Sequence, residues 1–129
     1  MQAKRLLRPL CAALLLIAGA AWSADIEMDT DWMKAIEDAN KNLSSDIALK
    51  NRKGAVDDTK ELEELFVKVD GFFGEKPDAH EAVALSKKSL ELTREISRAV
   101  TAGNFDGASE AATTLSRTCR SCHTFYKKS

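Results

Sequence analysis

Apolar side chains recur at intervals of three and four residues in four successive stretches of the chain. That spacing places them on one face of an α-helix, and no stretch alternates with period two for long enough to predict a strand. The predicted helices are a first from Thr30, a second from about Ala55 to Phe73, a third from Asp78 to Gly103, and a fourth from near Asn104 to Asp106 as far as Tyr126. This pattern restricts the chain to an all-α fold.

The connections between the predicted helices are short: Asn51 to Gly54, Gly74 to Asp78, and Gly103. Asp29 or Thr30 can cap the first helix, and Asp78 can cap the third. Each helix must bury its apolar stripe against the others, and short connections make successive helices antiparallel. We therefore expect an antiparallel up-down-up-down four-helix bundle. In that topology the start of the first helix and the end of the fourth lie side by side at one end.

Residues 1–23 have the features of a secretory signal peptide. A basic segment precedes an apolar core from Leu10 to Ala18, and small residues follow. The core is too short to be a spanning helix. The small residues Ala21 and Ser23 suit cleavage after Ser23. We therefore expect residues 24–129 to form one exported domain with no membrane span.

The charge and cysteine content of this domain restrict the kinds of partner and chemistry that we expect for it. The full chain has a net charge of −1, and the leader contributes basic but no acidic residues, so the mature domain is more acidic. That balance argues against nucleic acid, whose phosphates require a basic patch. Cys11 lies in the leader, which leaves Cys119 and Cys122. A disulfide between them would close a very small loop and stabilise little, so the two cysteines indicate a chemical role.

The two remaining cysteines belong to the segment Cys119-Arg120-Ser121-Cys122-His123, near the end of the fourth helix. Residues three and four apart on a helix share a face, so the two thiols and the imidazole project from one side within a turn. Two thiols can add to the vinyl groups of a haem while the next residue's imidazole reaches the iron. Cys-x-x-Cys-His is the attachment motif of c-type haem. The sequence predicts one haem c held by Cys119 and Cys122, with His123 as an axial ligand.

Other uses of this segment fit less well. A structural zinc site needs four ligands, and the only other histidine in the chain is His80. A thioredoxin-like dithiol lies at the N-terminus of a helix, where the helix dipole lowers the thiol pKa. Here the pair lies near a helix C-terminus in an all-helical chain. Two incidental core cysteines are the remaining alternative.

The mature chain resembles the class II cytochromes c, the group of cytochrome c′ and low-spin cytochrome c556. These are four-helix bundles with Cys-x-x-Cys-His near the C-terminus. The ending C-R-S-C-H-T-F-Y-K-K is similar to that family's ending, with Tyr126 and Lys127 as the aromatic and basic residues after the histidine. The stretch A-G-N-F-D-G-A-S-E-A-A is similar too. The chain also resembles cytochrome b562, a related bundle whose non-covalent haem has methionine and histidine ligands.

His123 would leave one axial position of the iron to be filled, and three side chains compete for it. Met28 precedes the first helix. His80 lies at the correct end of the bundle but is turned away from the apolar stripe of the third helix, so we expect it to be solvated. Met33 lies on the inward stripe of the first helix, at a height that matches His123. On the pattern alone, Met33 is as consistent with core packing as with iron ligation.

The resemblance implies that Met33 is the sixth ligand. In the segment Met-Lys-Ala-Ile, Met33 matches the methionine ligand of the low-spin cytochromes c556, whereas five-coordinate cytochromes c′ have an apolar residue there. The family often has an arginine one turn earlier, where this chain has Asp29, so the haem propionates would be contacted differently. Stripe and height give the expected walls of the pocket as Ile36, Phe72, Phe73, Leu85 and Leu115.

These features predict a soluble periplasmic c-type cytochrome that transfers single electrons to and from redox partner proteins. No nucleophile with a base, no acid and base pair and no nucleotide loop stands out in the sequence, so we do not expect an enzyme. The alternative is a five-coordinate haem protein of the cytochrome c′ type that binds NO or CO. A helix face could also pair two copies into a homodimer.

Overall fold

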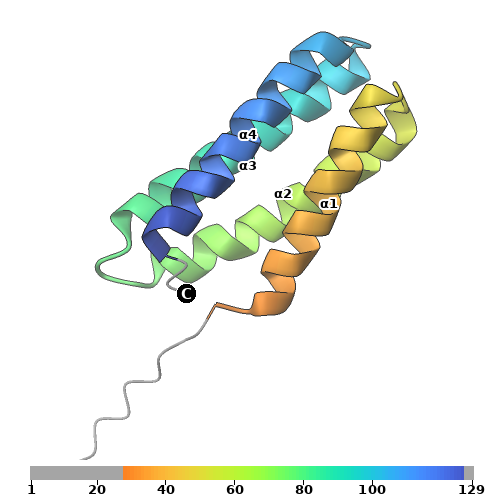
Figure 1. Ribbon diagram of the computed structural model, residues 1–129. Coiled ribbons are helices and arrows are strands. Elements are labelled where there is room, and N and C mark those ends of the chain that lie inside the picture. The colour runs from red at the N-terminus through yellow and green to blue at the C-terminus, as the bar shows by residue number, and fades with distance from the viewer. Residues whose placement is uncertain (1–27, 127–129) are drawn as a thin grey trace, which may run out of the picture.

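The computed structural model describes residues 28–126, so the predicted leader and its cleavage position lie outside the described residues. The described part contains four α-helices and no strand. The helices are α1 (Thr30–Ala48), α2 (Arg52–Gly74), α3 (His80–Thr101) and α4 (Phe105–Tyr126). Successive helices run in opposite directions (Figure 1). The predicted all-α, up-down-up-down four-helix bundle is confirmed.

An apolar core runs along the inside of the bundle, and every helix contributes to it. Leu43, Leu62, Ile96 and Leu115, one from each helix, are all 0% exposed. Complete burial of such a side chain stabilises a fold by ~1.5–3 kcal/mol. The contacts are closest between α2 and α3 and between α3 and α4, while α1 packs mainly on α2 and touches α4 much less. The interface of α1 with α4, called the α1/α4 seam below, is the loosest side of the bundle.

The connection between α1 and α2 is shorter than the sequence indicates. Lys50 takes a left-handed conformation with φ of 54°, and the Asn51 amide donates to the Asp46 carbonyl oxygen at 2.8 Å. This hydrogen-bond pattern ends a helix. Asn51 then caps α2 by accepting a hydrogen bond from the Gly54 amide at 3.3 Å. The predicted start of this helix at Ala55 is wrong by three residues, because Lys50 rather than Gly54 makes the left-handed turn.

Only one of the two ends of α3 lies where the sequence predicts it. Ala79, which is 5% exposed, takes the N-cap position and gives no side-chain hydrogen bond, so the prediction that Asp78 caps α3 is wrong. The Ala79 methyl group is buried in the core, and α3 begins at His80, with the cap one residue later than predicted. At the other end Gly103 has a φ of 76° and ends the helix as predicted. Asn104 caps α4 by accepting from the Gly107 amide at 3.0 Å.

The inward face of α3 differs from the predicted leucine stripe. Its buried residues include Ser86, Ser89 and Thr93, whereas Leu85 and Leu92 are only partly buried. The hydroxyl of Ser89 donates to the Leu85 carbonyl oxygen at 2.9 Å, and that of Thr93 donates to the Ser89 carbonyl oxygen at 2.8 Å. Because each hydroxyl is satisfied by its own helix, these small residues can be buried without an unpaired polar group.

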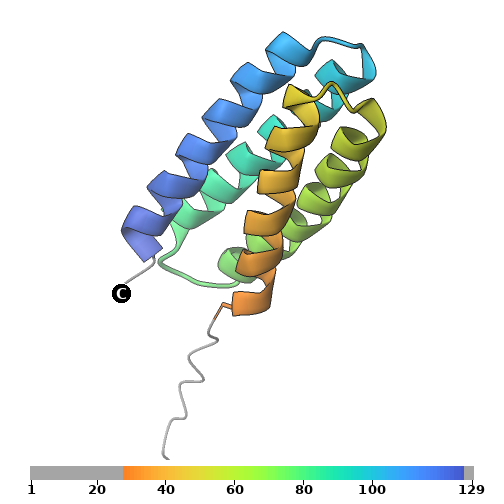
Figure 2. The ribbon, with the colours of Figure 1, turned by 45° about the vertical axis from the view of Figure 1, so that its right-hand side comes forward.

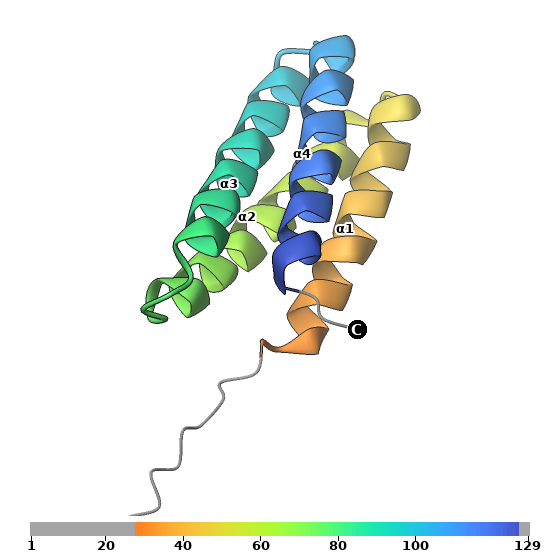
Figure 3. The same cartoon turned by 60° about the vertical axis from the view of Figure 1, so that its left-hand side comes forward.

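One end of the bundle brings together the start of α1, the end of α4 and the turn between α2 and α3 (Figures 1, 2 and 3). We call it the motif end, and the opposite end the far end. This arrangement is the one that the predicted topology requires. Figures 1 and 2 also show that α1 and α4 diverge toward the motif end. None of the helices in residues 28–126 is long and apolar enough to cross a membrane.

Candidate cofactor site

The Cys-x-x-Cys-His segment lies in the last turns of α4, at the motif end. The hydroxyls of Thr118 and Ser121 donate to the backbone carbonyl oxygens four residues earlier, at 3.0 and 3.1 Å, so these polar residues leave the helix unbroken. Cys119 and Cys122 are partly buried and their thiols are free. His123 is exposed. The helix therefore shields two thiols and leaves the adjacent imidazole accessible.

The two thiols have an electrostatic environment that suppresses their ionisation. Burial raises the pKa of the Cys119 thiol to about 11, and the nearby Cys122 adds to the shift. Burial also raises the pKa of Cys122. A reactive dithiol needs a lowered pKa, which the positive end of a helix dipole supplies, whereas this pair lies near the negative end. These surroundings disfavour a redox-cycling dithiol.

Met33 lies about one turn from the start of α1, where it is partly buried and packs against the core. The Asp29 side chain caps this helix by accepting from the Asp31 amide at 2.9 Å, which fixes the helix start close to Met33. His80 is the first residue of α3 and is exposed, as expected for a solvated histidine. Met28 precedes α1 and also packs against the core. Of these candidates for a ligand, Met33 is the one that both belongs to a helix and packs against the core.

A hydrogen bond across the α1/α4 seam shows how the two helices are aligned. Asn40 Nδ2 donates to Ser116 Oγ at 3.4 Å. The helices are antiparallel, so seven residues back from Asn40 and seven forward from Ser116 reach the same height, about two turns nearer the motif end. The residues there are Met33 and His123. Because seven residues also return nearly to the same helix face, Met33 and His123 belong to the facing sides of α1 and α4.

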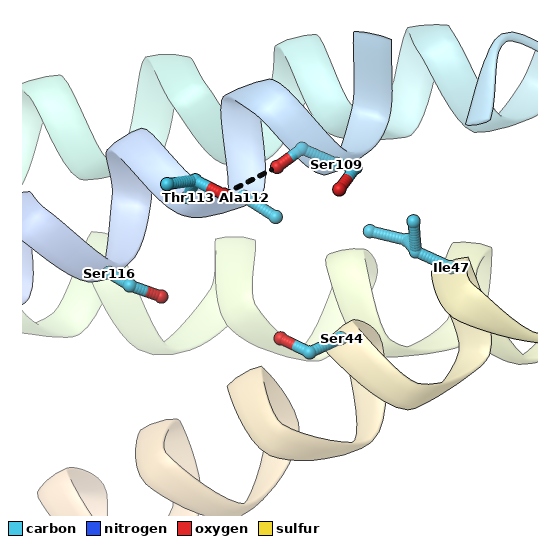
Figure 4. A pocket seen from close by; sticks show the side chains of 6 residues that line it. All are labelled: Ser44, Ile47, Ser109, Ala112, Thr113 and Ser116. Carbon is cyan, nitrogen blue, oxygen red and sulfur yellow. Dashed lines mark hydrogen bonds between the residues drawn. The ribbon is translucent and has the colours of Figure 1, made fainter. Parts of the chain in front are cut away.

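The seam beyond this hydrogen bond, toward the far end, is polar and incompletely filled (Figure 4). A pocket of about 160 Å³ is lined by Ser44, Ile47, Ser109, Ala112, Thr113 and Ser116. Ser44 Oγ donates to the Asn40 carbonyl oxygen, and Thr113 Oγ1 to the Ser109 carbonyl oxygen, each at 2.9 Å. Ile47 and Ala112 belong to the apolar stripes of their helices, but the apolar spacing does not indicate the polar residues of this pocket. The available signal was Asn40 itself, a polar residue on the inward stripe between Ile36 and Leu43.

Two aromatic rings lie near the turn between α2 and α3, also at the motif end. Phe72 and Phe73 pack edge to face, with ring centroids 5.1 Å apart and an interplanar angle of 84°. Lys76 Nζ lies 4.5 Å from the centroid of the Phe72 ring, a cation–π distance. Among the expected pocket walls, Ile36, Phe73 and Leu115 are buried and Phe72 packs against the core. Leu85 is only partly buried, because α3 turns its serines and Thr93 inward.

The described residues 28–126 contain no group of three or more His, Cys, Asp or Glu side chains that could hold a metal ion. A comparison of the chain with protein-family models, with curated proteins and with solved structures finds no match. What the site can hold therefore has to follow from its own side chains. These are two thiols and an imidazole on one helix, and a thioether at the same height on the helix opposite.

Proposed function

We propose that this protein is an electron-transfer cytochrome of the class II c type, with one haem attached to Cys119 and Cys122. The residues fit this group in their chemistry and in their surroundings. The free thiols and the imidazole of His123 follow one another on α4. The two helices that would enclose the group, α1 and α4, touch little and diverge toward the motif end. A flat cofactor between them would separate few packed side chains.

The chain's residues would divide the work of holding the group. Cys119 and Cys122 would anchor it by two thioether bonds, and His123 and Met33 would bind the iron from opposite helices. Haem supplies reversible one-electron chemistry. Thioether sulfur is a soft ligand that favours the ferrous state, so Met33 would raise the reduction potential relative to an open or bis-histidine site. The matched heights of Met33 and His123 are the observation that carries this assignment.

The proposal extends to the location and the partners of the protein. The signal peptide predicted in residues 1–23 would export the chain to the periplasm, where it would exchange electrons with other redox proteins. We propose a carrier rather than an enzyme, because the site offers attachment and ligation by its own residues and no group poised as a nucleophile.

The decisive experiment is to purify the exported full chain and record its spectra. We expect haem to stay with the protein after acid-acetone extraction, a low-spin ferrous spectrum that CO leaves unchanged, and the weak red charge-transfer band of thioether ligation in the ferric state. A high-spin spectrum that shifts at once with CO would instead identify a gas-binding protein of the cytochrome c′ type. Haem that acid-acetone removes would reject the c-type assignment altogether.

A further inference from the structure

Asn40 is an unfavourable residue for stability at the position that it occupies. Its Nδ2 makes a long hydrogen bond of 3.4 Å to Ser116 Oγ, while its Oδ1 is buried with no hydrogen-bond partner among the described residues. Leaving a buried acceptor unsatisfied costs more free energy than one neutral hydrogen bond returns. A leucine, such as the fully buried Leu43 on the next turn, would serve the core better. A role other than stability therefore has to explain this amide.

The packing of α1 on α2 contributes to its height in the bundle, but the side chains that meet at the α1/α4 seam distinguish poorly between different relative heights of α1 and α4. The large apolar side chains of α1 enter the core, and α1 packs mainly on α2. The residues that line the seam beyond Asn40 are small, apart from Ile47. Small side chains form shallow ridges and grooves, so a slide of one helical turn would lose few contacts at this interface. A specific polar contact can then supply the discrimination between registers that the packing of this seam barely provides.

We propose that the hydrogen bond between Asn40 and Ser116 is a register lock, which holds α1 at the one height that brings Met33 level with His123. A single buried asparagine sets the register of coiled coils in the same way, at a cost in stability. A slide of one turn would move Met33 by ~5.4 Å along the bundle, too far to bind an iron held by His123. Asn40 is thus a positioning residue. Its purpose rests on the proposed function, whereas the lock itself is a property of the two helices.

The variant Asn40→Leu tests the lock, and Thr93→Val is its matched control. Thr93 is fully buried and donates within its own helix to the Ser89 carbonyl oxygen, so this control also removes a buried polar group but no contact between helices. We expect Asn40→Leu to be at least as resistant to denaturant as the wild type, yet to lose most of the thioether band and to bind CO. Thr93→Val should keep the band and exclude CO. The exchanged pair Asn40→Ser with Ser116→Asn should restore the band.

Disulfide trapping measures the relative height of α1 and α4 independently of any bound iron. Ser44 and Ala112 lie four residues from Asn40 and Ser116 in opposite chain directions, so they are level in the observed register. Ser44 and Ser109 would become level only after a slide of about one turn. With Cys119 and Cys122 blocked by haem, or replaced by alanine if free, cysteines at the level pair should cross-link about tenfold faster than at the shifted pair, a preference of ~1.4 kcal/mol. Asn40→Leu should bring this ratio close to one.

The outcomes separate the lock from the proposed function. A wild-type thioether band that Asn40→Leu retains, with an unchanged cross-linking ratio, would overturn the lock and leave the cytochrome assignment intact. A wild type without the band would reject ligation by Met33, and the cross-linking ratio alone would then decide whether Asn40 fixes the register. An Asn40→Leu protein that is less stable than Thr93→Val and keeps its ligation would show that the amide is merely structural.

Discussion

Replacing Asp58 by asparagine should stabilise the protein at pH 7 and leave its stability near pH 4 unchanged. Asp58 belongs to α2 at the far end of the bundle, and its Oδ2 is buried with no hydrogen-bond partner among the described residues. Burial raises the pKa of this carboxyl from 3.8 to about 6, and the neighbouring Asp46 carboxylate adds to the shift. Between about pH 4 and pH 6 the folded protein therefore holds a proton that the unfolded chain has already lost.

The sign and size of the effect follow from this shift. A carboxyl whose folded pKa is raised destabilises the fold above its folded pKa, and the penalty disappears below its unfolded value. At about 1.4 kcal/mol per pKa unit, the rise from 3.8 to about 6 corresponds to at most ~3 kcal/mol. Asp58 is only partly buried, and solvent screening reduces this to ~1 kcal/mol. In a domain of this size ~1 kcal/mol raises the melting temperature by about 5 °C.

Thermal unfolding of the wild type and of Asp58→Asn between pH 4 and pH 8 measures the prediction. The difference in melting temperature should be close to zero at pH 4, grow toward pH 6 and then stay constant. Glu91→Gln is the control, because Glu91 is an exposed carboxylate on α3 that takes no part in the shift at Asp58. An equal stabilisation at pH 4 and pH 7, or the same gain in Glu91→Gln, would refute the reasoning about Asp58.

The remaining predictions concern the site and the far end of α3. Replacing both Cys119 and Cys122 by alanine should make the proposed haem extractable by acid-acetone, whereas each single replacement should leave one thioether bond. Met33→Ala should turn the ferrous haem high-spin and admit CO, while His80→Ala, at an exposed position, should leave the spectra unchanged. Gly103→Ala should cost ~1 kcal/mol in denaturant unfolding, because φ is 76° there, without altering the spectra of a site at the opposite end.

The sequence predicted the fold class because each helix carries its own apolar period, which is a local property. Its errors lie where local preference and tertiary packing compete. Glycine favours the left-handed conformation, so the sequence predicts the turn after α1 at the segment containing Gly54, but Lys50 adopts that conformation. The side chain of Asp78 predicts it as the cap of α3, but Ala79, which is buried in the core, takes that position. Neither outcome can be read from residue preferences alone.

The candidate site also has a part that local periodicity predicts and a part that depends on tertiary packing. Cys119, Cys122 and His123 are neighbours in the sequence, so their shared face on a helix needed only the periodicity. The height of Met33 relative to His123 needed the topology as well, and the Asn40 contact now supports it with a residue count. That contact could not be predicted, because the register between two helices depends on which side chains meet. The apolar periodicity contains no information on a contact between two polar residues.

The packing of α4 differs between its two neighbours, and its looser side, toward α1, is the side of the candidate site. Toward α3 the packing is close, with residues such as Val100 and Ala108 that are 0% exposed. Toward α1 the seam has small polar residues and a long hydrogen bond. A bundle that packed equally tightly on both sides would have to break large apolar contacts to admit a flat cofactor. Here the close packing lies on the other interfaces, including that of α1 with α2, and the α1/α4 seam needs only a contact that keeps the two helices level, which is a task that one amide can perform.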